Sequence, residues 1–253
     1  MSSRDKIHKS LKKALEPVDW IYALWEAGAA AFDRVDQWSD IDIYVVCDDD
    51  KVNDVFEIAE KKLNEDFGID LKYTVPLPKE NFYQQHFYLL EGFSAFELID
   101  LAVFKKGCPE KFLEPEIHGN AKFIFNKNDL VKIPELDGVE LNKTLHERVK
   151  EIAVRTEMFK AMVNKEIYRG NFIEAFDYYK MFTLSGLVDL LRIKYTPFHH
   201  NFRTRYIHYE LPPEIVSRLA SFYYLQDLDD LDARNKEALM WIEDLIEELK
   251  KEE

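Results

Sequence analysis

The chain has 253 residues, of which 47% are hydrophobic and 14% aromatic, enough for a sizeable core in one large or two modest domains. Its 48 acidic and 34 basic residues give a formal net charge of −14, which disfavours binding to the phosphate backbone of nucleic acids. The two cysteines are too few for a disulfide framework. Because no apolar run approaches the ~18 residues of a membrane-spanning helix and no signal-peptide core follows the N-terminus, we expect a cytoplasmic protein.

The first half of the chain alternates between predicted helices and strands. Residues 7–15 have helical spacing of apolar side chains, and strands are predicted for "WIYALWEAG", ending at Gly28, and for "SDIDIYVVC". A helix is predicted from about residue 52 to its stop at Gly68. The strict alternation of "IDLKYTV" predicts a strand with one buried face, and "FYQQHFYLLEG", "FSAFELIDLAVF" and "AKFIFNK" predict three more strands.

The second half of the chain is predicted to be helical. A long helix ends at Gly170, Asn171 is placed to cap a second one, and a final helix ends in the charged tail "KKEE". The stretch "KIPELDG" separates the two patterns, which predicts domains at residues 1–138 and 139–253. The predicted fold class is α+β, with a mixed β-sheet and its helices followed by a helical bundle.

Two aspartates flank one isoleucine where the second predicted strand begins. In an extended strand, residues i and i+2 point to the same face, so Asp40 and Asp42 are expected side by side. Two such carboxylates repel each other unless a positive charge lies between them. A divalent cation such as Mg²⁺, which prefers oxygen ligands, would meet that need.

A third carboxylate is predicted on a later strand. Asp100 interrupts an apolar row in "FELIDLAVF", where a lone charge is costly without a partner. Glu97 is a second choice, on the opposite strand face, and Asp100 is also explained as a partner of a buried backbone group. Gly28 lies where the backbone comes close to another group, since glycine permits such an approach.

The set Gly28, Ser39-Asp40-Ile41-Asp42 and Asp100 resembles the nucleotidyltransferase superfamily typified by DNA polymerase beta. The resemblance covers the first ~140 residues and implies two Mg²⁺ ions held by Asp40, Asp42 and Asp100. It also implies a nucleoside triphosphate at the turn of Gly28 and Ala29, where the superfamily usually has Gly-Ser or Gly-Gly.

Ser39 and Lys180 complete the expected nucleotide-binding residues. The pattern favours a turn or capping role for Ser39, and Lys180 is equally explained as a lysine that extends its charge into solvent from an apolar helix row. Three histidines, His199, His200 and His208, have no zinc-ligand spacing, and we interpret them as surface or interdomain residues. Arg205 and Tyr206 belong either to an ordinary helix connection or to an acceptor pocket.

Within the superfamily, "DQWSDIDIYVV", "FIFNKNDL" and, more loosely, "RGNFIEAFDYYKMFTLSGLVDLLRIKYTP" are similar to segments of aminoglycoside nucleotidyltransferases and their uncharacterised relatives. This resemblance implies transfer of a nucleoside monophosphate, AMP from ATP, to a hydroxyl of a small-molecule acceptor, for which an aminoglycoside-like compound is one candidate. A nucleotide-binding regulatory module, a protein adenylyltransferase and an RNA-tailing enzyme are alternatives, the last disfavoured by the charge. The acceptor, the nucleotide, the general base (Asp100, Glu97 or a carboxylate of the helical half) and the oligomeric state stay open.

Overall fold

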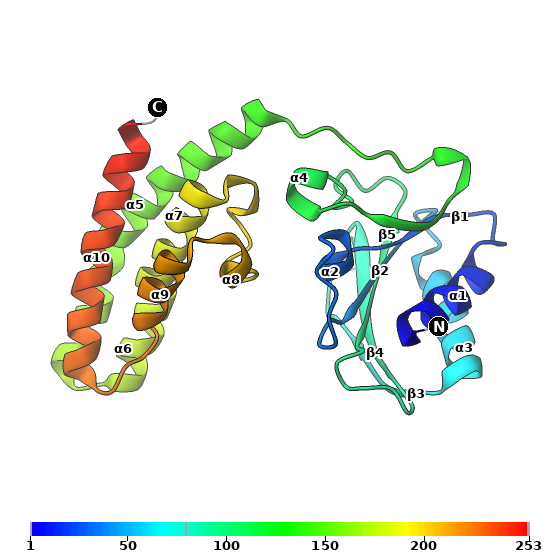
Figure 1. Cartoon of the computed structure of the whole chain (residues 1–253), viewed down its shortest axis with the longest axis horizontal. Helices are drawn as coiled ribbons and strands as arrows, with labels where there is room; N and C mark the ends of the chain where they lie inside the picture. Colours follow the sequence, from blue (N-terminus) through cyan, green and yellow to red (C-terminus); the bar gives the residue numbers. More distant parts are fainter. Residues whose placement is uncertain (1, 79, 252–253) are drawn as a thin grey trace. The chain divides into compact units, whose positions relative to one another are not determined.

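A computed structural model of the chain describes residues 2–78 and 80–251 and divides it into two compact units (Figure 1). The first unit spans residues 1–136 and contains the β-sheet, and the second spans residues 137–253 and is helical. We call them the sheet unit and the helical unit and describe each by itself. The α+β fold class predicted from the sequence is confirmed.

The sheet unit is built on a six-stranded mixed sheet. Its strands are β1 (Ile21–Glu26), β2 (Ile41–Cys47), β3 (Ile69–Thr74), β4 (Tyr83–Leu90), β5 (Ile99–Lys105) and β6 (Lys122–Asn126). They lie in the order β3-β4-β5-β2-β1-β6, with β2 and β5 parallel and the other neighbours antiparallel. The crossover from β2 to β5 therefore places two strands that are distant in the sequence side by side.

Short and long helices flank this sheet: α1 (Ser3–Leu15), α2 (Gly28–Ala31), α3 (Val52–Phe67), α4 (Pro115–His118) and the 3₁₀ turn η1 (Lys127–Asp129). Helix α1 begins with a capping box, in which the side chains of Ser2 and Asp5 satisfy each other's backbone N–H groups. Helix α3 ends at Gly68, whose φ of +76° favours glycine. Both helices form where the apolar spacing predicts them.

The two faces of the sheet are covered differently. On one face, β2 and β5 bury Ile43, Val45, Leu101 and Val103 against α1 and α3 (Figure 1). On the other face, one half of the sheet packs Trp25 and Phe104 against Cys108 and Leu113. The remaining half of that second face carries the polar residues Asp42 and Asp100, because successive strand residues alternate between faces.

Strand β3 differs from its expected burial. The alternation of Leu71 and Tyr73 predicts a buried face, yet these side chains are 61% and 59% exposed. The prediction of a strand is confirmed and that of a half-buried strand is wrong. The reason is position, because β3 is an edge strand that α1 and α3 do not cover on this side.

The helical unit consists of helices with one irregular segment. They are α5 (Gly138–Arg169), α6 (Phe172–Tyr178), the π-helix η2 (Tyr179–Leu184), α7 (Ser185–Tyr195), the 3₁₀ turn η3 (Pro197–His199), α8 (Ile207–Glu210), α9 (Pro213–Ser221) and α10 (Leu228–Lys251). Helix α5 ends at Gly170 in the left-handed conformation. Asn171 precedes α6 as expected, but its side chain donates to Glu166 rather than capping the helix.

A buried arginine organises the irregular segment between α7 and α9. Arg192 is completely buried, and its guanidinium pairs with Glu210 and donates to the backbone carbonyls of Arg203 and Arg205. Because Arg203 and Tyr206 have positive φ angles, this part of the chain has no regular backbone ladder of its own. The guanidinium donors supply hydrogen bonds that a regular helix would otherwise provide.

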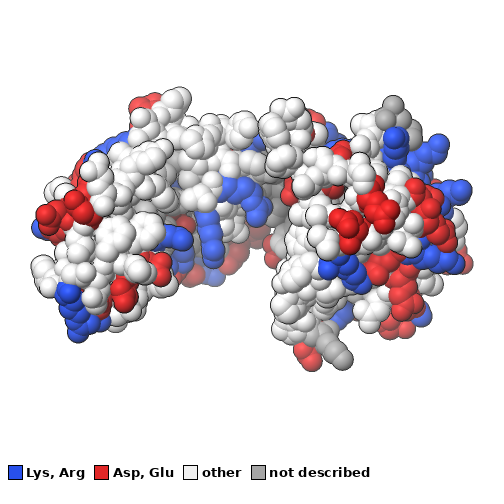
Figure 2. Space-filling model, turned by 90° about the horizontal axis from the view of Figure 1, so that it is seen from below, with Lys and Arg blue, Asp and Glu red and all other residues white. Residues whose placement is uncertain are grey.

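None of the helices within residues 2–78 and 80–251 combines the length and apolar composition needed to cross a membrane. On the face shown in Figure 2, acidic and basic side chains are interspersed over the sheet unit.

Candidate functional site

Asp42 and Asp100 face each other across the parallel pair of strands. Asp42 of β2 is the register partner of Asp100 of β5, and both side chains are partly buried on the face opposite α1 and α3. Neighbouring strands lie about 4.8 Å apart, so directly opposite side chains on one face are close neighbours. The structure thus brings together two of the three carboxylates that the sequence singled out.

Asp40 lies just outside the strand ladder. Strand β2 begins at Ile41, so the side chain of Asp40 is exposed and its orientation is not fixed by strand pairing. Its backbone carbonyl accepts a hydrogen bond of 2.7 Å from Nη2 of Arg4. Strand pairing therefore fixes the expected orientation of Asp42 but not that of Asp40, which precedes Ile41, the first residue of β2.

Gly28 packs directly on the carboxylate of Asp42. It begins α2, two residues after β1 ends at Glu26, rather than ending the strand itself as predicted. Its φ is +54°, and a Cβ built on it would lie only 1.7 Å from Oδ2 of Asp42. The preceding Ala27 N–H donates to the backbone carbonyl of Asp42 at 3.0 Å. A side chain at position 28 would occupy the space of the Asp42 carboxylate, so the position requires glycine.

Asp100 has an amide partner that the sequence did not reveal. Nε2 of Gln85, on the neighbouring strand β4, lies 2.7 Å from both carboxylate oxygens of Asp100. Burial raises the pKa of Asp100 to about 6, the Gln85 hydrogen bond opposes that rise, and the charge of Asp40 adds to it. The folded chain therefore favours the protonated form of Asp100 more than water does.

Arg4 supplies positive charge next to the acidic residues. Its guanidinium pairs with the buried Glu26, whose other oxygen lies 3.2 Å from Nε2 of His8. Burial lowers the pKa of Arg4, while the charges of Asp42, Asp40 and Glu97 act to raise it. Arg4 lies far from these residues in the sequence, and its helical position gives no signal of this contact. Arg4 therefore supplies part of the positive charge expected beside Asp40 and Asp42.

The carboxylates suit a metal ion as a pair rather than as a ready-made triad. Within residues 2–78 and 80–251, no three His, Cys, Asp or Glu side chains are arranged to hold a metal ion as they stand. Mg²⁺ is commonly held by only one or two carboxylates together with substrate oxygens and water. Asp42 and Asp100, two oxygen donors on one sheet face beside the Gly28 backbone, fit that donor set.

The other residues expected at the site lie in different surroundings. Ser39 forms a turn, in which its Oγ donates to Asp36 at 2.9 Å and accepts from the Asp36 N–H, and Ala29 lies within α2. Glu97 accepts a hydrogen bond of 3.0 Å from the Ser94 N–H in the loop before β5. Lys180 is exposed on η2 in the helical unit, as a lysine that extends its charge into solvent would be.

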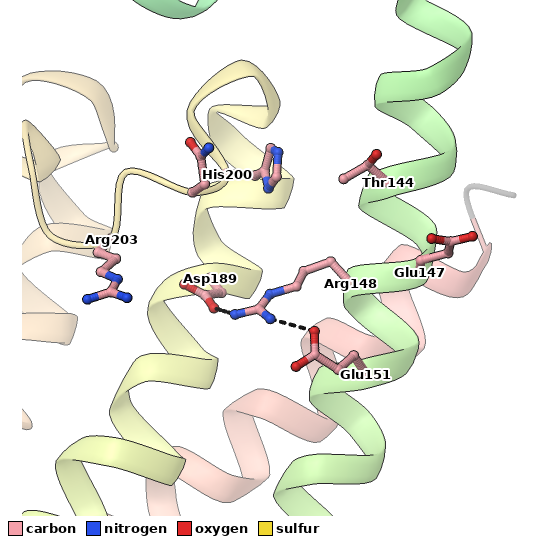
Figure 3. A pocket seen from close by; sticks show the side chains of 8 residues that line it. Thr144, Glu147, Arg148, Glu151, Asp189, His200 and Arg203 are labelled. Atoms are coloured by element: carbon pink, nitrogen blue, oxygen red, sulfur yellow. Dashed lines mark hydrogen bonds and ion pairs between the residues drawn. The ribbon is translucent and has the colours of Figure 1, made fainter. Parts of the chain in front are cut away.

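The helical unit contains a polar pocket of its own, with a volume of about 530 Å³ (Figure 3). Thr144, Glu147, Arg148, Glu151, Asp189, His200, Asn201 and Arg203 line it. The guanidinium of Arg148 is held between Asp189 of α7 and Glu151 of α5, as the dashed lines in Figure 3 show. Arg205 and Tyr206 do not line this pocket, and His199 instead lies 3.0 Å from Glu210.

Comparison with known proteins gives remote similarities among solved structures. No known family matches the chain, and no curated protein matches its sequence. An aminoglycoside 6-adenyltransferase from Bacillus subtilis is 13% identical, with 98% of this chain and 90% of that one covered and a TM-score of 0.40. A nucleotidyltransferase-like protein from Exiguobacterium sibiricum is 12% identical, with coverages of 96% and 74% and a TM-score of 0.41.

A third similar structure is a spectinomycin adenyltransferase from Enterococcus faecialis, solved with ATP and spectinomycin. It is 13% identical, the coverages are 96% and 90%, and the TM-score is 0.35. All three are described as adenyltransferases or as nucleotidyltransferase-like. Identities this low assign neither a substrate nor an activity to this chain.

Proposed function

We propose that the protein is a Mg²⁺-dependent nucleotidyltransferase that moves a nucleoside monophosphate, AMP from ATP, to a hydroxyl of a small-molecule acceptor. One observation carries the proposal: Asp42 and Asp100 meet in register across parallel strands, and the Gly28 backbone packs directly on the Asp42 carboxylate. Two adjacent carboxylates suit metal binding better than core packing, and the absence of a side chain at Gly28 leaves its backbone accessible to a phosphate.

In this proposal, Asp42 and Asp100 hold the metal, with Asp40 joining them from the edge of β2, and Gly28 and Ala29 approach the triphosphate with their backbone. Two bound Mg²⁺ ions would neutralise charge on the attacking and leaving oxygens. Ser39 and Lys180 are the further nucleotide-binding residues that we propose.

The chain's own acid-base chemistry follows from Asp100. As a carboxylate on the sheet face where the acceptor hydroxyl is expected, Asp100 would accept the proton of that hydroxyl. The hydroxyl oxygen then forms a bond to the α-phosphorus as the bond from that phosphorus to the bridging oxygen breaks. Pyrophosphate leaves with the electron pair of the broken bond. Glu97 or a carboxylate of the helical unit is the alternative base.

Pyrophosphate release from ATP and Mg²⁺, measured against a panel of hydroxyl compounds, tests the proposal. We expect Asp42→Asn and Asp100→Asn each to lower the rate by about 100-fold or more, since each removes a charge that acts on the transition state. Asp70→Asn, at an exposed carboxylate of β3, is the matched control and should retain the wild-type rate. Wild-type rates in both site variants, with the fold intact by circular dichroism, would refute the proposal.

The same variants separate the proposal from a binding module with little turnover. Calorimetry that showed ATP binding abolished by Asp42→Asn, with no pyrophosphate released by the wild type, would favour the module. Ala29 lacks the hydroxyl that the superfamily often has at this turn, and this difference favours the binding module as the second candidate.

A further inference from the structure

The acidic pair is the first half of a longer row of residues across the sheet. Asp42 of β2 is opposite Asp100 of β5, Asp100 is opposite Phe87 of β4, and Phe87 is opposite Tyr73 of β3. Directly opposite residues project to the same face of a sheet. Two carboxylates and two aromatic rings therefore follow one another on the face that α1 and α3 leave uncovered.

The two rings lie next to each other and form an apolar patch beside Asp100. Their centroids are 6.4 Å apart and their planes are 28° from parallel. Tyr73 is 59% exposed and Phe87 is only partly buried. A bound planar ring would cover apolar surface that otherwise stays in contact with water.

The order of the strands places the two rings and Gly28 on opposite sides of the acidic pair. Gly28 follows β1 and contacts Asp42, whereas Phe87 and Tyr73 lie on β4 and β3, beyond Asp100 on the other side (Figure 1). Under the proposed function, on which this inference rests, the phosphates occupy the Gly28 side. The acceptor then approaches Asp100 from the side of the rings.

We infer that the acceptor carries a planar aromatic ring close to its reacting hydroxyl, and that this ring stacks on Phe87 and Tyr73. Adjacent strands are about 4.8 Å apart, so a hydroxyl held at Asp100 leaves its own ring over Phe87, with Tyr73 one strand further. Gln85 holds Asp100 from the same strand that carries Phe87, which ties the position of the carboxylate to that of the ring. Phe87 and Tyr73 are thus residues that select the acceptor.

Ligand-observed NMR with small probes tests this inference without any turnover. N-acetyltyrosinamide carries a hydroxyl on a planar ring, N-acetylserinamide carries a hydroxyl without a ring, and methyl glucoside carries hydroxyls on a saturated ring. With the intact chain, we expect saturation transfer and upfield-shifted ring protons for N-acetyltyrosinamide alone.

Variants locate the binding. Tyr73→Ala and Phe87→Ala should each weaken it about three- to tenfold, because a stacked aromatic pair contributes about 0.5–1.5 kcal/mol beyond its buried area. Tyr73→Phe should restore wild-type binding, and Tyr168→Ala, at an 82% exposed tyrosine of the helical unit, should leave it unchanged.

Three results would overturn the inference: no binding of N-acetyltyrosinamide to the wild type, equal binding of methyl glucoside, or full binding in both alanine variants with their fold intact. Failure of the proposed function has a different signature. In that case ATP and Mg²⁺ release no pyrophosphate in any acceptor screen, while the tyrosine probe still binds at Phe87 and Tyr73.

Discussion

Glycine at position 28 is the residue on which the geometry of the acidic pair depends most directly. Its positive φ and the 1.7 Å separation between a built Cβ and Oδ2 of Asp42 are independent reasons why no other residue fits. The positive φ would strain the backbone of any other residue, and a Cβ at this position would displace the Asp42 carboxylate. A matched glycine allows the two costs to be measured separately.

Gly28→Ala should destabilise the protein and abolish activity. Gly92→Ala is the control, because Gly92 also has a positive φ of +74° but has no atom within 4 Å of its built Cβ. We expect about 1–2 kcal/mol of destabilisation for Gly92→Ala from the left-handed backbone alone, and more for Gly28→Ala. Urea denaturation and pyrophosphate release measure the two effects. Equal destabilisation and unchanged activity in both variants would contradict the steric argument.

Asp100 should make the stability of the sheet unit depend on pH. Its pKa is about 6 in the folded chain, above the usual value of 3.8, so folding favours the protonated form. The resulting stabilisation is complete below about pH 4 and is lost as the pH rises through 6. Asp100→Asn should therefore be more stable than wild type at pH 7.5, by about 1–3 kcal/mol.

At pH 4 the two proteins should be equally stable. Thermal unfolding in the presence of EDTA, which removes metal ions from the carboxylates, provides the measurement. A variant that is less stable than wild type at pH 7.5 would show that Asp100 is compensated in the folded chain and that its burial carries no cost.

At the scale of elements, α1 contributes to the site through Arg4. The helix packs on the sheet with Ile7, Leu11 and Leu15, and its first turn carries the guanidinium to Glu26 and to the carbonyl of Asp40. A helix that the apolar spacing explains as a cover for the core thus also fixes the start of β2. Its polar contacts were not predictable, because they join residues that no local pattern connects.

Arg4→Met should lower both stability and activity, because it removes the guanidinium from the buried Glu26 and the hydrogen bond to the Asp40 carbonyl. We expect a loss of about 3 kcal/mol in the free energy of unfolding, as for other broken buried ion pairs. Lys9→Met, at an exposed position of the same helix, is the control. Urea denaturation monitors stability, and equal midpoints for the two variants would rule out a structural role for Arg4.

Strand β3 shows what sequence patterns leave undetermined. Alternation correctly identified a strand, since period two is a local property of the chain. Whether its apolar face is covered depends on its place at the edge of the sheet and on which face the helices occupy. For the same reason the sequence pointed to Asp42 and Asp100, which interrupt local apolar patterns, and missed Gln85 and Phe87, which become neighbours of Asp100 only through strand order.

At the scale of the whole molecule, the two units have separate hydrophobic cores. The core residues of the sheet unit all lie within residues 1–136, and those of the helical unit all lie within residues 137–253. Arg192 and Glu210 form their buried ion pair entirely inside the helical unit. Each unit accordingly has the buried apolar surface that a folding domain requires.

Expressed alone, residues 1–136 and residues 137–253 should each unfold cooperatively. In the full chain, Arg192→Met should lower the unfolding temperature of the helical unit, because it leaves the buried Glu210 carboxylate without its guanidinium, and should leave the sheet unit unchanged. Calorimetry of the two fragments, the full chain and its Arg192→Met variant provides the test. A single transition that shifts as a whole with Arg192→Met would show that the units fold as one.

The parallel pairing of β2 with β5 has a kinetic consequence. The segment that joins these strands includes α3, β3 and β4, so the carboxylates of Asp42 and Asp100 meet only after a long chain segment has closed. Such non-local pairing is slow to form, and here it also brings like charges together. Newly synthesised chains would thus acquire the acidic pair late, and a divalent cation present during refolding should shorten the final phase.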